Sequence, residues 1–233
     1  MDFDDLHVVV TGGTGALGRA VVAALIDAAA TCHIPYRSES EVERFPFRDH
    51  PQAKLYPNSE LGDERSVDPL FERIPTLWAS IHLAGSFAFG SHKEMTEATL
   101  RRQIKTNLVT CALCCRGALR AFARTGKGGR IVNVAARPAL EWRTGANMAA
   151  YTASKAAVAA LTVALAEEVA KEGVLVNAVA PSIMDTPANR MDMPKADFST
   201  WPKVEEVART ILFLASPANK VTRGAVVPVY GQV

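Results

Sequence analysis

The sequence lacks a long apolar run, and it carries little excess charge of either sign. Its longest strongly apolar stretch, AAVAALTVALA at 156–166, is well short of a membrane span. The N-terminal MDFDDLHVVV opens with acids and does not resemble a signal peptide. A formal net charge of +2 gives no electrostatic reason to expect nucleic acid or an acidic membrane as a partner. We therefore expect a soluble, cytoplasmic protein with no nucleic-acid or membrane partner.

Cysteine is also scarce, with four residues in the chain. Cys111, Cys114 and Cys115 lie in CALCC on a predicted helix, and Cys32 stands apart. The neighbouring sequence offers no histidine or second cysteine pair to complete a metal site. We therefore interpret these residues as small apolar side chains on a packed helix face and predict no metal site. Free thiols also fit a reducing compartment.

A third shortage concerns hydroxyl groups near the middle of the chain. Between Arg130 and Arg143 there is no Ser, Thr, Tyr or Cys. Shortly after this gap come Tyr151 and Lys155, one helical turn apart. The sequence thus raises the question of whether a tyrosine acid works here without a second hydroxyl.

Strand-like and helix-like segments alternate along the whole chain of 233 residues. This pattern predicts one α/β domain over 1–233, a doubly wound parallel sheet of about seven strands with helices on both faces. Its hydrophobic content of 48% is that of an ordinary globular protein. The expected strands lie at 6–11, 31–36, 54–57, within 76–85, and at 130–135, 174–180 and 225–230. The expected helices include one that ends near 29, and others at about 67–74, 93–125, 149–172 and 204–215.

The segment at 183–202 has the weakest regular character. It holds three prolines and three methionines, with Met184, Phe198 and Trp201 among its large apolar residues. One interpretation is an irregular connection packed on the surface. We favour a substrate lid, because ligands of open α/β sheets bind beyond the carboxyl ends of the strands and dense apolar residues need something to cover.

The clearest motif is TGGTGALG at 11–18, directly after the first expected strand. Gly13, Gly15 and Gly18 form G-x-G-x-x-G, which permits a tight turn and lets the backbone approach a pyrophosphate. The helix that follows offers unpaired N–H groups and a partial positive charge to the phosphates. In this strand–helix context the motif predicts dinucleotide binding.

The end of the second expected strand bears on the choice of dinucleotide. An acid there would hold the ribose hydroxyl of NAD, whereas an arginine would accommodate the phosphate of NADP. The chain reads IPYRSES, so Arg37 and Ser38 precede the first acid, Glu39. We favour NADP(H) over NAD(H), although Arg37 is also compatible with a solvated surface charge.

The pair Tyr151 and Lys155 predicts proton transfer. Residues at i and i+4 share a helix face, and a nearby ammonium favours phenolate, so we expect Lys155 to lower the pKa of Tyr151. Tyr151 then donates a proton to the atom that gains charge when hydride reaches the adjacent carbon.

In this order and spacing, these motifs resemble the compact Rossmann branch of the short-chain dehydrogenase/reductase family. The resemblance covers essentially the whole chain and also uses LAG at 83–85, Asn107, GRIVNV at 129–134 and VNAVAPSIMDTP at 176–187. It implies that Lys155 binds the nicotinamide ribose, that Asn107 helps to hold a water in a proton relay, and that Trp142 lies on the substrate side. It places the cofactor against Gly12, Gly13, Thr14, Gly15, Ala16, Leu17, Gly18, Arg37, Ala84, Gly85, Tyr151, Lys155, Pro181, Ile183 and Thr186. It also implies a homodimer or homotetramer built through the 93–125 and 149–172 helices.

Several positions depart from the family pattern. The serine that orients the substrate is replaced by Ala136, and Ala135 beside it has no hydroxyl either. His82 and Leu83 replace an asparagine pair; His82 is either catalytic or, as we favour, satisfied in the core. The loop at 184–201 resembles that of dihydropteridine reductase, which tolerates alanine at the serine position. Since a quinonoid acceptor is already activated towards hydride, loss of the hydroxyl favours such an acceptor over a simple ketone.

The sequence therefore favours an NAD(P)H-dependent reductase with Tyr151 as proton donor and a small-molecule carbonyl, imine or quinonoid substrate. A non-catalytic NAD(P)-binding sensor or scaffold is the alternative, but it has no evident need for both Tyr151 and Lys155. An extended-branch epimerase is disfavoured, because 233 residues leave little room for its substrate domain.

Overall fold

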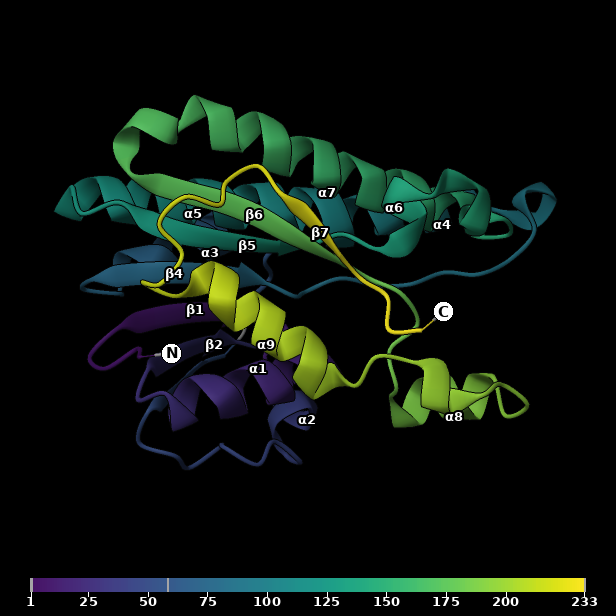
Figure 1. The fold of residues 1–233 in the computed structure, drawn as a ribbon, viewed down its shortest axis with the longest axis horizontal. Coiled ribbons are helices and arrows are strands. Elements are labelled where there is room, and N and C mark those ends of the chain that lie inside the picture. The colour runs from purple at the N-terminus through teal and green to yellow at the C-terminus, as the bar shows by residue number, and fades with distance from the viewer. Residues whose placement is uncertain (1, 58, 233) are drawn as a thin grey trace.

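A computed structural model describes residues 2–57 and 59–232 as seven parallel strands in one sheet, in the order β3-β2-β1-β4-β5-β6-β7 (Figure 1). The strands are β1 (His7–Thr11), β2 (Thr31–Pro35), β3 (Ala53–Tyr56), β4 (Leu77–His82), β5 (Gly129–Val134), β6 (Val174–Pro181) and β7 (Val226–Val229). The α-helices are α1 (Ala16–Asp27), α2 (Glu39–Val42), α3 (Glu64–Glu72), α4 (Glu97–Gln103), α5 (Thr110–Thr125), α6 (Arg137–Leu140), α7 (Ala149–Glu168), α8 (Pro187–Asp192) and α9 (Val204–Ala215). The predicted α/β class and doubly wound parallel sheet are confirmed.

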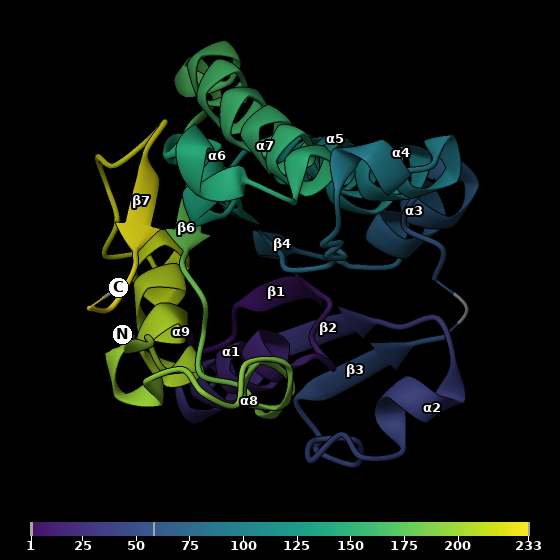
Figure 2. The same ribbon diagram turned by 90° about the vertical axis from the view of Figure 1, so that its right-hand side faces the viewer.

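Helices cover both faces of this sheet, and β1 shows how its residues serve both. Val8 and Val10 are buried in the core with α1 and α9, whereas Val9 is buried in the core with α3, α5 and α7. Figure 2 shows the two helical layers on opposite sides of the strands. Alternation of side chains along a strand explains this division, and burial of each valine contributes about 1.5–3 kcal/mol.

The order of the strands reverses between β1 and β4, which places a crevice at their carboxyl ends. The backbone N–H of Leu83 donates to Thr11 O, and the N–H of Ala84 donates to Thr11 Oγ1. These bonds hold the segment after β4 against the glycine turn after β1. The expected cofactor residues of both segments therefore meet at one place.

The expected continuous helix at 93–125 is wrong in detail. A 3-10 turn at His92–Glu94 precedes α4, and a π-helical segment, Ile104–Val109, separates α4 from α5. Thr96 caps α4 by accepting a hydrogen bond from the N–H of Thr99, so the α-helix begins there. The π-helical segment inserts one wide turn between α4 and α5, and this turn determines the direction of the Asn107 side chain.

The 183–202 segment is more regular than expected. It contains α8 and a 3-10 turn at Phe198–Thr200. The Thr186 side chain caps α8 by accepting from the N–H of Asn189, which explains why a helix starts at Pro187. The expectation of an irregular connection overlooked this S/T-type cap.

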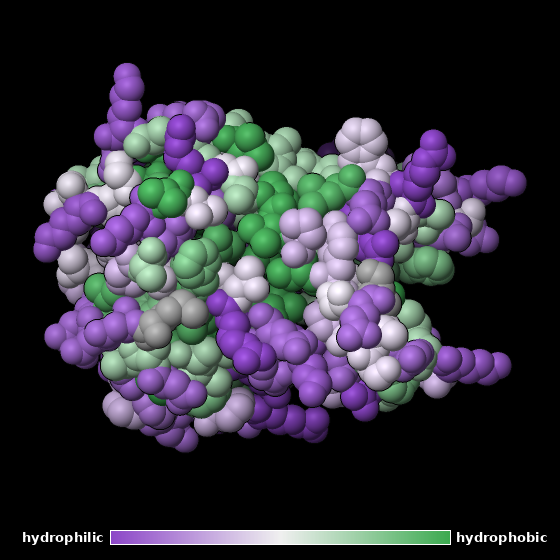
Figure 3. All heavy atoms as spheres, in the orientation of Figure 1, coloured by the Kyte–Doolittle hydropathy of each residue, from purple (hydrophilic) through white to green (hydrophobic). Residues whose placement is uncertain are grey.

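Two apolar features of the structure are the helix α7 and a surface patch near β7. By length and composition α7 is apolar enough to cross a membrane, but its Val158, Thr162 and Leu165 are buried in the domain, so we interpret it as a core helix. Apolar residues also gather across the middle of the face in Figure 3, where Figure 1 places the edge strand β7 between α7 and α9.

Candidate active site

The glycine turn after β1 leaves a bare backbone at the N-terminus of α1. Gly12 has a φ of 67°, and a Cβ there would lie 2.8 Å from the Ala84 nitrogen. At Gly18 a Cβ would collide with Gly12 O, so the helix packs directly on the turn. In the described part of the chain, no side chain caps α1 at Gly15, and its first turn carries no acid. Free N–H groups at the end of a 12-residue helix fit an anionic pyrophosphate.

The other expected cofactor residues of this turn differ in burial. Thr14, Leu17 and Gly18 are buried, while Gly15 and Ala16 are exposed. Thr14 is held in place by Arg19, whose Nε donates to Thr14 O over 2.8 Å. The turn is thus rigid on its inner side and open on its outer side, as a dinucleotide requires.

Arg37 lies just beyond β2, where the ribose of a dinucleotide would sit. Its side chain is 69% exposed and its Nε is 3.5 Å from Glu41. The Glu39 carboxylate instead accepts a 2.9 Å hydrogen bond from the Tyr36 hydroxyl. Ser38 and Ser40 add hydroxyls 3.0 Å apart. The end of β2 therefore presents a guanidinium and two hydroxyls, with its first acid already engaged.

Tyr151 lies in the first turn of α7, and its ring packs edge-on against Phe87 with centroids 5.0 Å apart. Burial raises the pKa of Tyr151 to about 12. The expectation that Lys155 lowers this pKa is wrong for this structure, because burial dominates and the Lys155 ammonium is directed elsewhere. At neutral pH Tyr151 is a protonated phenol, which is the form that a proton donor needs.

Lys155 is buried one turn further along α7, and its Nζ donates to Val134 O over 2.8 Å. Burial lowers the pKa of Lys155 to about 8, partly opposed by Cys111. A Cβ on Gly85 would lie 3.5 Å from Lys155 Nζ and 2.7 Å from Asn107 Oδ1. The absence of a side chain at Gly85 thus lets the backbone after β4 pack directly against Asn107 and Lys155.

Asn107 is buried in the π-helical segment and anchors the surrounding elements. Its Nδ2 donates to Ser86 O, Gln103 Oε1 and Ser154 Oγ, and its Oδ1 accepts from the Ser86 N–H. Ser154 Oγ in turn donates to Tyr151 O over 2.7 Å. Asn107 therefore joins α7 to the segment after β4, and the three expected catalytic residues lie together.

The Ala135–Ala136 pair follows β5, and both methyl groups are buried. Ala136 is the N-cap residue of α6, whose Arg137 pairs with Glu141 at 2.7 Å and stacks over the Tyr230 ring. Ser182, at the end of β6, donates its hydroxyl to Tyr230 O. This hydrogen bond ties the residue after β6 to the residue after β7.

The residues of the 183–202 segment, for which a lid stays a prediction, divide into exposed and buried positions. Ile183 is 42% exposed, whereas Trp201 is 6% exposed and packs on Phe198 with ring centroids 5.0 Å apart. Arg190 stacks over Phe198 and pairs with Asp185 at 2.6 Å. Met184 packs against the core, and Pro181 and Thr186 are buried at the two ends of the connection that leads into α8.

A buried polar cluster lies beneath the site. His82 Nδ1 is 2.8 Å from Asn133 Oδ1 and its Nε2 is 2.8 Å from Ser80 Oγ. Cys111 and Cys115 of α5 approach the same asparagine. A hydrogen bond from Cys115 lowers the pKa of the Cys111 thiol, burial opposes this, and a contact with His82 lowers it further. His82 is therefore satisfied in the core, as we favoured, and the fold brings to the cysteines a histidine that the neighbouring sequence does not supply.

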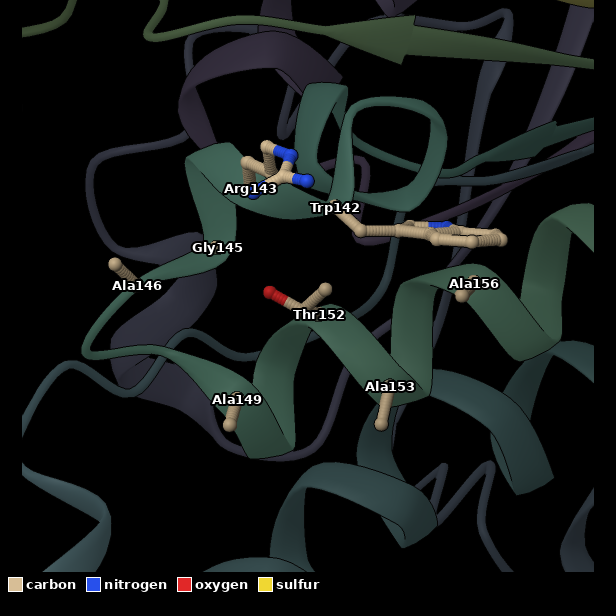
Figure 4. Close-up of a pocket in the computed structure, with 8 residues that line it drawn as sticks. All are labelled: Trp142, Arg143, Gly145, Ala146, Ala149, Thr152, Ala153 and Ala156. Atoms are coloured by element: carbon tan, nitrogen blue, oxygen red, sulfur yellow. The ribbon is translucent and has the colours of Figure 1, made fainter.

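Trp142 does not lie beside Tyr151. It is 74% exposed and lines a shallow groove with Thr152, Ala153 and Ala156 on another side of α7 (Figure 4). Its indole Nε1 donates to Ala139 O over 3.1 Å. The implied position of Trp142 on the substrate side therefore stays a prediction that this arrangement does not favour.

Sequence reasoning missed three residues that support the site. Phe87 covers the Tyr151 ring, and Ser154 and Gln103 fix the Asn107 amide. The spacing of Ser154, three residues after Tyr151, is a detectable signal because it shares the helix with the catalytic pair. Phe87 lies in a loop, where no periodicity predicts its direction.

Comparisons with known proteins match this geometry. A family model described as short chain dehydrogenase matches residues 6–197. The cis-4-hydroxycyclohexanecarboxylate dehydrogenase of Sinomonas cyclohexanicum is 33% identical over 244 residues, covering 98% of this chain and 96% of that protein. The chain belongs to the short-chain dehydrogenase family. As a member of this family, it is an NAD(P)-dependent oxidoreductase.

Other relatives agree with this assignment. Galactitol 2-dehydrogenase of Rhizobium johnstonii is 32% identical over 248 residues, covering 97% of this chain and 94% of that protein. The structure of a short chain dehydrogenase/reductase family protein superposes with a TM-score of 0.89 at 27% identity, covering 99% and 98% of the two chains. The structure of ElxO with NADP bound has the same fold, with a TM-score of 0.87 at 24% identity and coverage of 97% and 98%. The resemblance to dihydropteridine reductase stays a prediction.

Proposed function

We propose that this short-chain dehydrogenase is a reductase in which Tyr151 donates the proton that accompanies hydride transfer. The observation that supports it best is the juxtaposition of half-buried Tyr151 with buried Lys155 and Asn107, beside Gly85 and at the carboxyl end of β4. The bare glycine turn and the uncapped α1 fit a dinucleotide in the adjacent crevice. A bound nicotinamide dinucleotide supplies the hydride.

Each residue of this group has a distinct role in the proposal. Tyr151 holds its proton at neutral pH, since burial raises its pKa to about 12, and releases it to the substrate atom that gains negative charge. Lys155, whose ammonium here donates to Val134 O, would hold the nicotinamide ribose of a bound dinucleotide and would then favour the phenolate that remains after proton transfer. Asn107, through Ser154, fixes the turn of α7 that carries Tyr151.

We further propose that the acceptor is activated before it binds. Ala135 and Ala136 place two buried methyl groups where a supporting hydroxyl is expected. Loss of one oxyanion-type donor costs about 10²–10³-fold in kcat. A quinonoid or imine-like acceptor is less dependent on that donor than a ketone, and the exposed Phe87 ring beside Tyr151 suits an apolar, planar molecule.

NADP(H) is the proposed nucleotide. Arg37, Ser38 and Ser40 offer a cation and two hydroxyls at the end of β2. One oxygen of the Glu39 carboxylate already accepts a hydrogen bond from the Tyr36 hydroxyl, so Glu39 is in part engaged away from the ribose. A phosphate on that ribose therefore finds more partners here than a hydroxyl does.

Tyr151→Phe tests the proposed function. NADPH and NADH oxidation is measured with quinonoid dihydropterin, quinones, simple ketones and cyclic ketones that bear a carboxylate; the last class follows from the cyclohexanecarboxylate relative. We expect kcat to fall about 10²–10⁴-fold with little change in the Kd for NADPH. Tyr56→Phe, at the β3 edge of the sheet, is the control. No oxidation with any acceptor, together with NADPH binding unaffected by Tyr151→Phe, would contradict catalysis and favour a nucleotide sensor.

The proposal also includes self-association and a cytoplasmic location. The outer side of α7 exposes Ala153, Ala160, Val163 and Ala164, an apolar stripe with small side chains. Helices α4 and α5 add charged residues beside it, including Arg101. A homodimer or homotetramer formed through these helices removes the stripe from water.

A further inference from the structure

We propose that His82, Cys111 and Cys115 form a buried site for one thiophilic divalent cation of the Zn²⁺ class. Their ligand atoms all lie within 4.8 Å of one another, and all three side chains are buried. They come from β4 and from two successive turns of α5, so the site exists only in the folded chain. It is separate from the proton-transfer group, although Cys111 follows Asn107 by one helical turn.

The distances suit tetrahedral coordination. With Zn–S and Zn–N bonds of about 2.3 and 2.0 Å, a nitrogen and a sulfur ligand lie about 3.6 Å apart. Cys115 Sγ is 3.6 Å from His82 Nδ1. Asn133 Oδ1, which is 2.8 Å from Nδ1 and 3.2 Å from Cys111 Sγ, becomes a fourth ligand if it moves back by a few tenths of an ångström.

The hydrogen bonds around the cluster also indicate a cation. Asn133 Nδ2 donates to Thr162 Oγ1, so its Oδ1 faces His82, Cys111 and Cys115. Three donors thus converge on one amide oxygen that has two lone pairs. When a metal ion binds, the two thiol protons leave to solvent and the His82 proton moves from Nδ1 to Nε2, where Ser80 Oγ accepts it, so all three donors become ligands.

Outer contacts and charge complete the site. Metal-bound histidine usually donates its second ring N–H to a neighbour, and Ser80 Oγ lies 2.8 Å from His82 Nε2 to receive it. Two thiolates neutralise a divalent cation, so the loaded site carries no net charge into the core. A Zn²⁺-class ion is therefore favoured over a monovalent one, which would leave a buried negative charge.

Co²⁺ is the probe, because its thiolate complexes absorb in the near ultraviolet and tetrahedral complexes show intense visible bands. The reduced full-length chain is mixed with Co²⁺ when folded and also refolded from urea in its presence, because burial slows entry. We expect one Co²⁺ per chain, displacement by Zn²⁺ with loss of both bands, and a Zn²⁺-dependent rise in Tm.

The variants assign the ligands. Cys115→Ala is expected to abolish both bands and the rise in Tm. Cys114→Ala is the matched control, since Cys114 is equally buried on the same helix but lies outside the cluster. Absence of the bands in the wild-type chain by both routes overturns the proposal, as do bands retained by Cys115→Ala. Loss of two thiols to a Cys111–Cys115 disulfide, without metal uptake, also overturns it and identifies a redox pair.

Discussion

Lys155 shows how burial alone sets the charge of a functional side chain. Its ammonium is inside the domain with Val134 O as its hydrogen-bond acceptor, and burial lowers its pKa from 10.5 to about 8. Its proton is therefore held less tightly in the folded chain than in the unfolded chain.

This shift predicts a pH dependence of stability. Between about pH 8 and pH 10.5 the unfolded chain holds the Lys155 proton and the folded chain has released it, so stability from this residue rises with pH. Below about pH 8 both states are protonated and the unfavourable contribution is constant. The free energy of unfolding in urea is measured for wild type and Lys155→Met. Between about pH 8 and 10, the value for wild type should rise relative to that for Lys155→Met. Lys171→Met, an exposed control, should show no such trend.

Arg37 carries the prediction on nucleotide choice. Arg37→Asp replaces the guanidinium with a carboxylate, which repels a ribose phosphate and accepts hydrogen bonds from a ribose hydroxyl. We expect the ratio of kcat/KM for NADPH over NADH to fall at least tenfold. Arg44→Asp, an exposed arginine after α2, is the charge-matched control. An unchanged ratio removes Arg37 from the nucleotide site.

Ala136 carries the prediction on the acceptor. Ala136→Ser restores a hydroxyl beside the reacting atoms, so turnover of a simple ketone would rise about 10²–10³-fold if the natural substrate were one. For an activated acceptor we expect turnover to stay within a few-fold or to fall. Ala136 is also the N-cap residue of α6, where a serine stabilises a helix. Tm is therefore measured as well, so that a gain in stability is distinguished from a gain in turnover. A large gain with simple ketones would exclude the quinonoid proposal.

At the scale of elements, two glycines at the start of α1 have different roles. We expect Gly18 to be needed for folding and Gly15 for nucleotide binding. At Gly15 a Cβ would lie 3.3 Å from Gly12 O, a contact that a small shift relieves, whereas at Gly18 it would overlap that oxygen. Gly15→Ala should keep Tm within a few degrees and weaken NADPH binding at least tenfold, because the new methyl enters the phosphate cradle. Gly18→Ala should lower Tm markedly. Calorimetry measures Tm and fluorescence titration measures NADPH binding. Equal losses of Tm in Gly15→Ala and Gly18→Ala would contradict these separate roles.

The elements also show what local sequence can predict. Helix α9 spans the expected 204–215, since an amphipathic run follows a capping interaction between Lys203 N and Glu206. The π segment around Asn107 was not predictable, because its residues are compatible with an ordinary α-helix and only contacts to Ser86 and Ser154 favour the wide turn. The same limit applies to His82 and Cys111, which only the packing of α5 on β4 brings together.

For the whole molecule, the apolar outer side of α7 predicts self-association. Val163 is 44% exposed in the middle of that side. Val163→Glu places a carboxylate in the expected interface, where desolvation without a partner is unfavourable, so the dissociation constant should rise at least tenfold. Val221→Glu, at a residue 84% exposed outside α7, is the control. Light scattering after size-exclusion chromatography measures both; a wild-type monomer at high concentration would exclude the proposed interface.

The three tryptophans give this molecule separate optical reporters of its parts. Trp142 is 74% exposed beside α7, whereas Trp201 is 6% exposed near the end of the 183–202 segment and Trp78 donates its Nε1–H to Ala215 O. Emission from Trp142 should therefore be quenched by acrylamide and protected when copies associate. Emission from Trp201 should respond when the segment around Phe198 moves. Two single-tryptophan chains, each measured in its own solution, would thus report on assembly and on movement of the 183–202 segment separately.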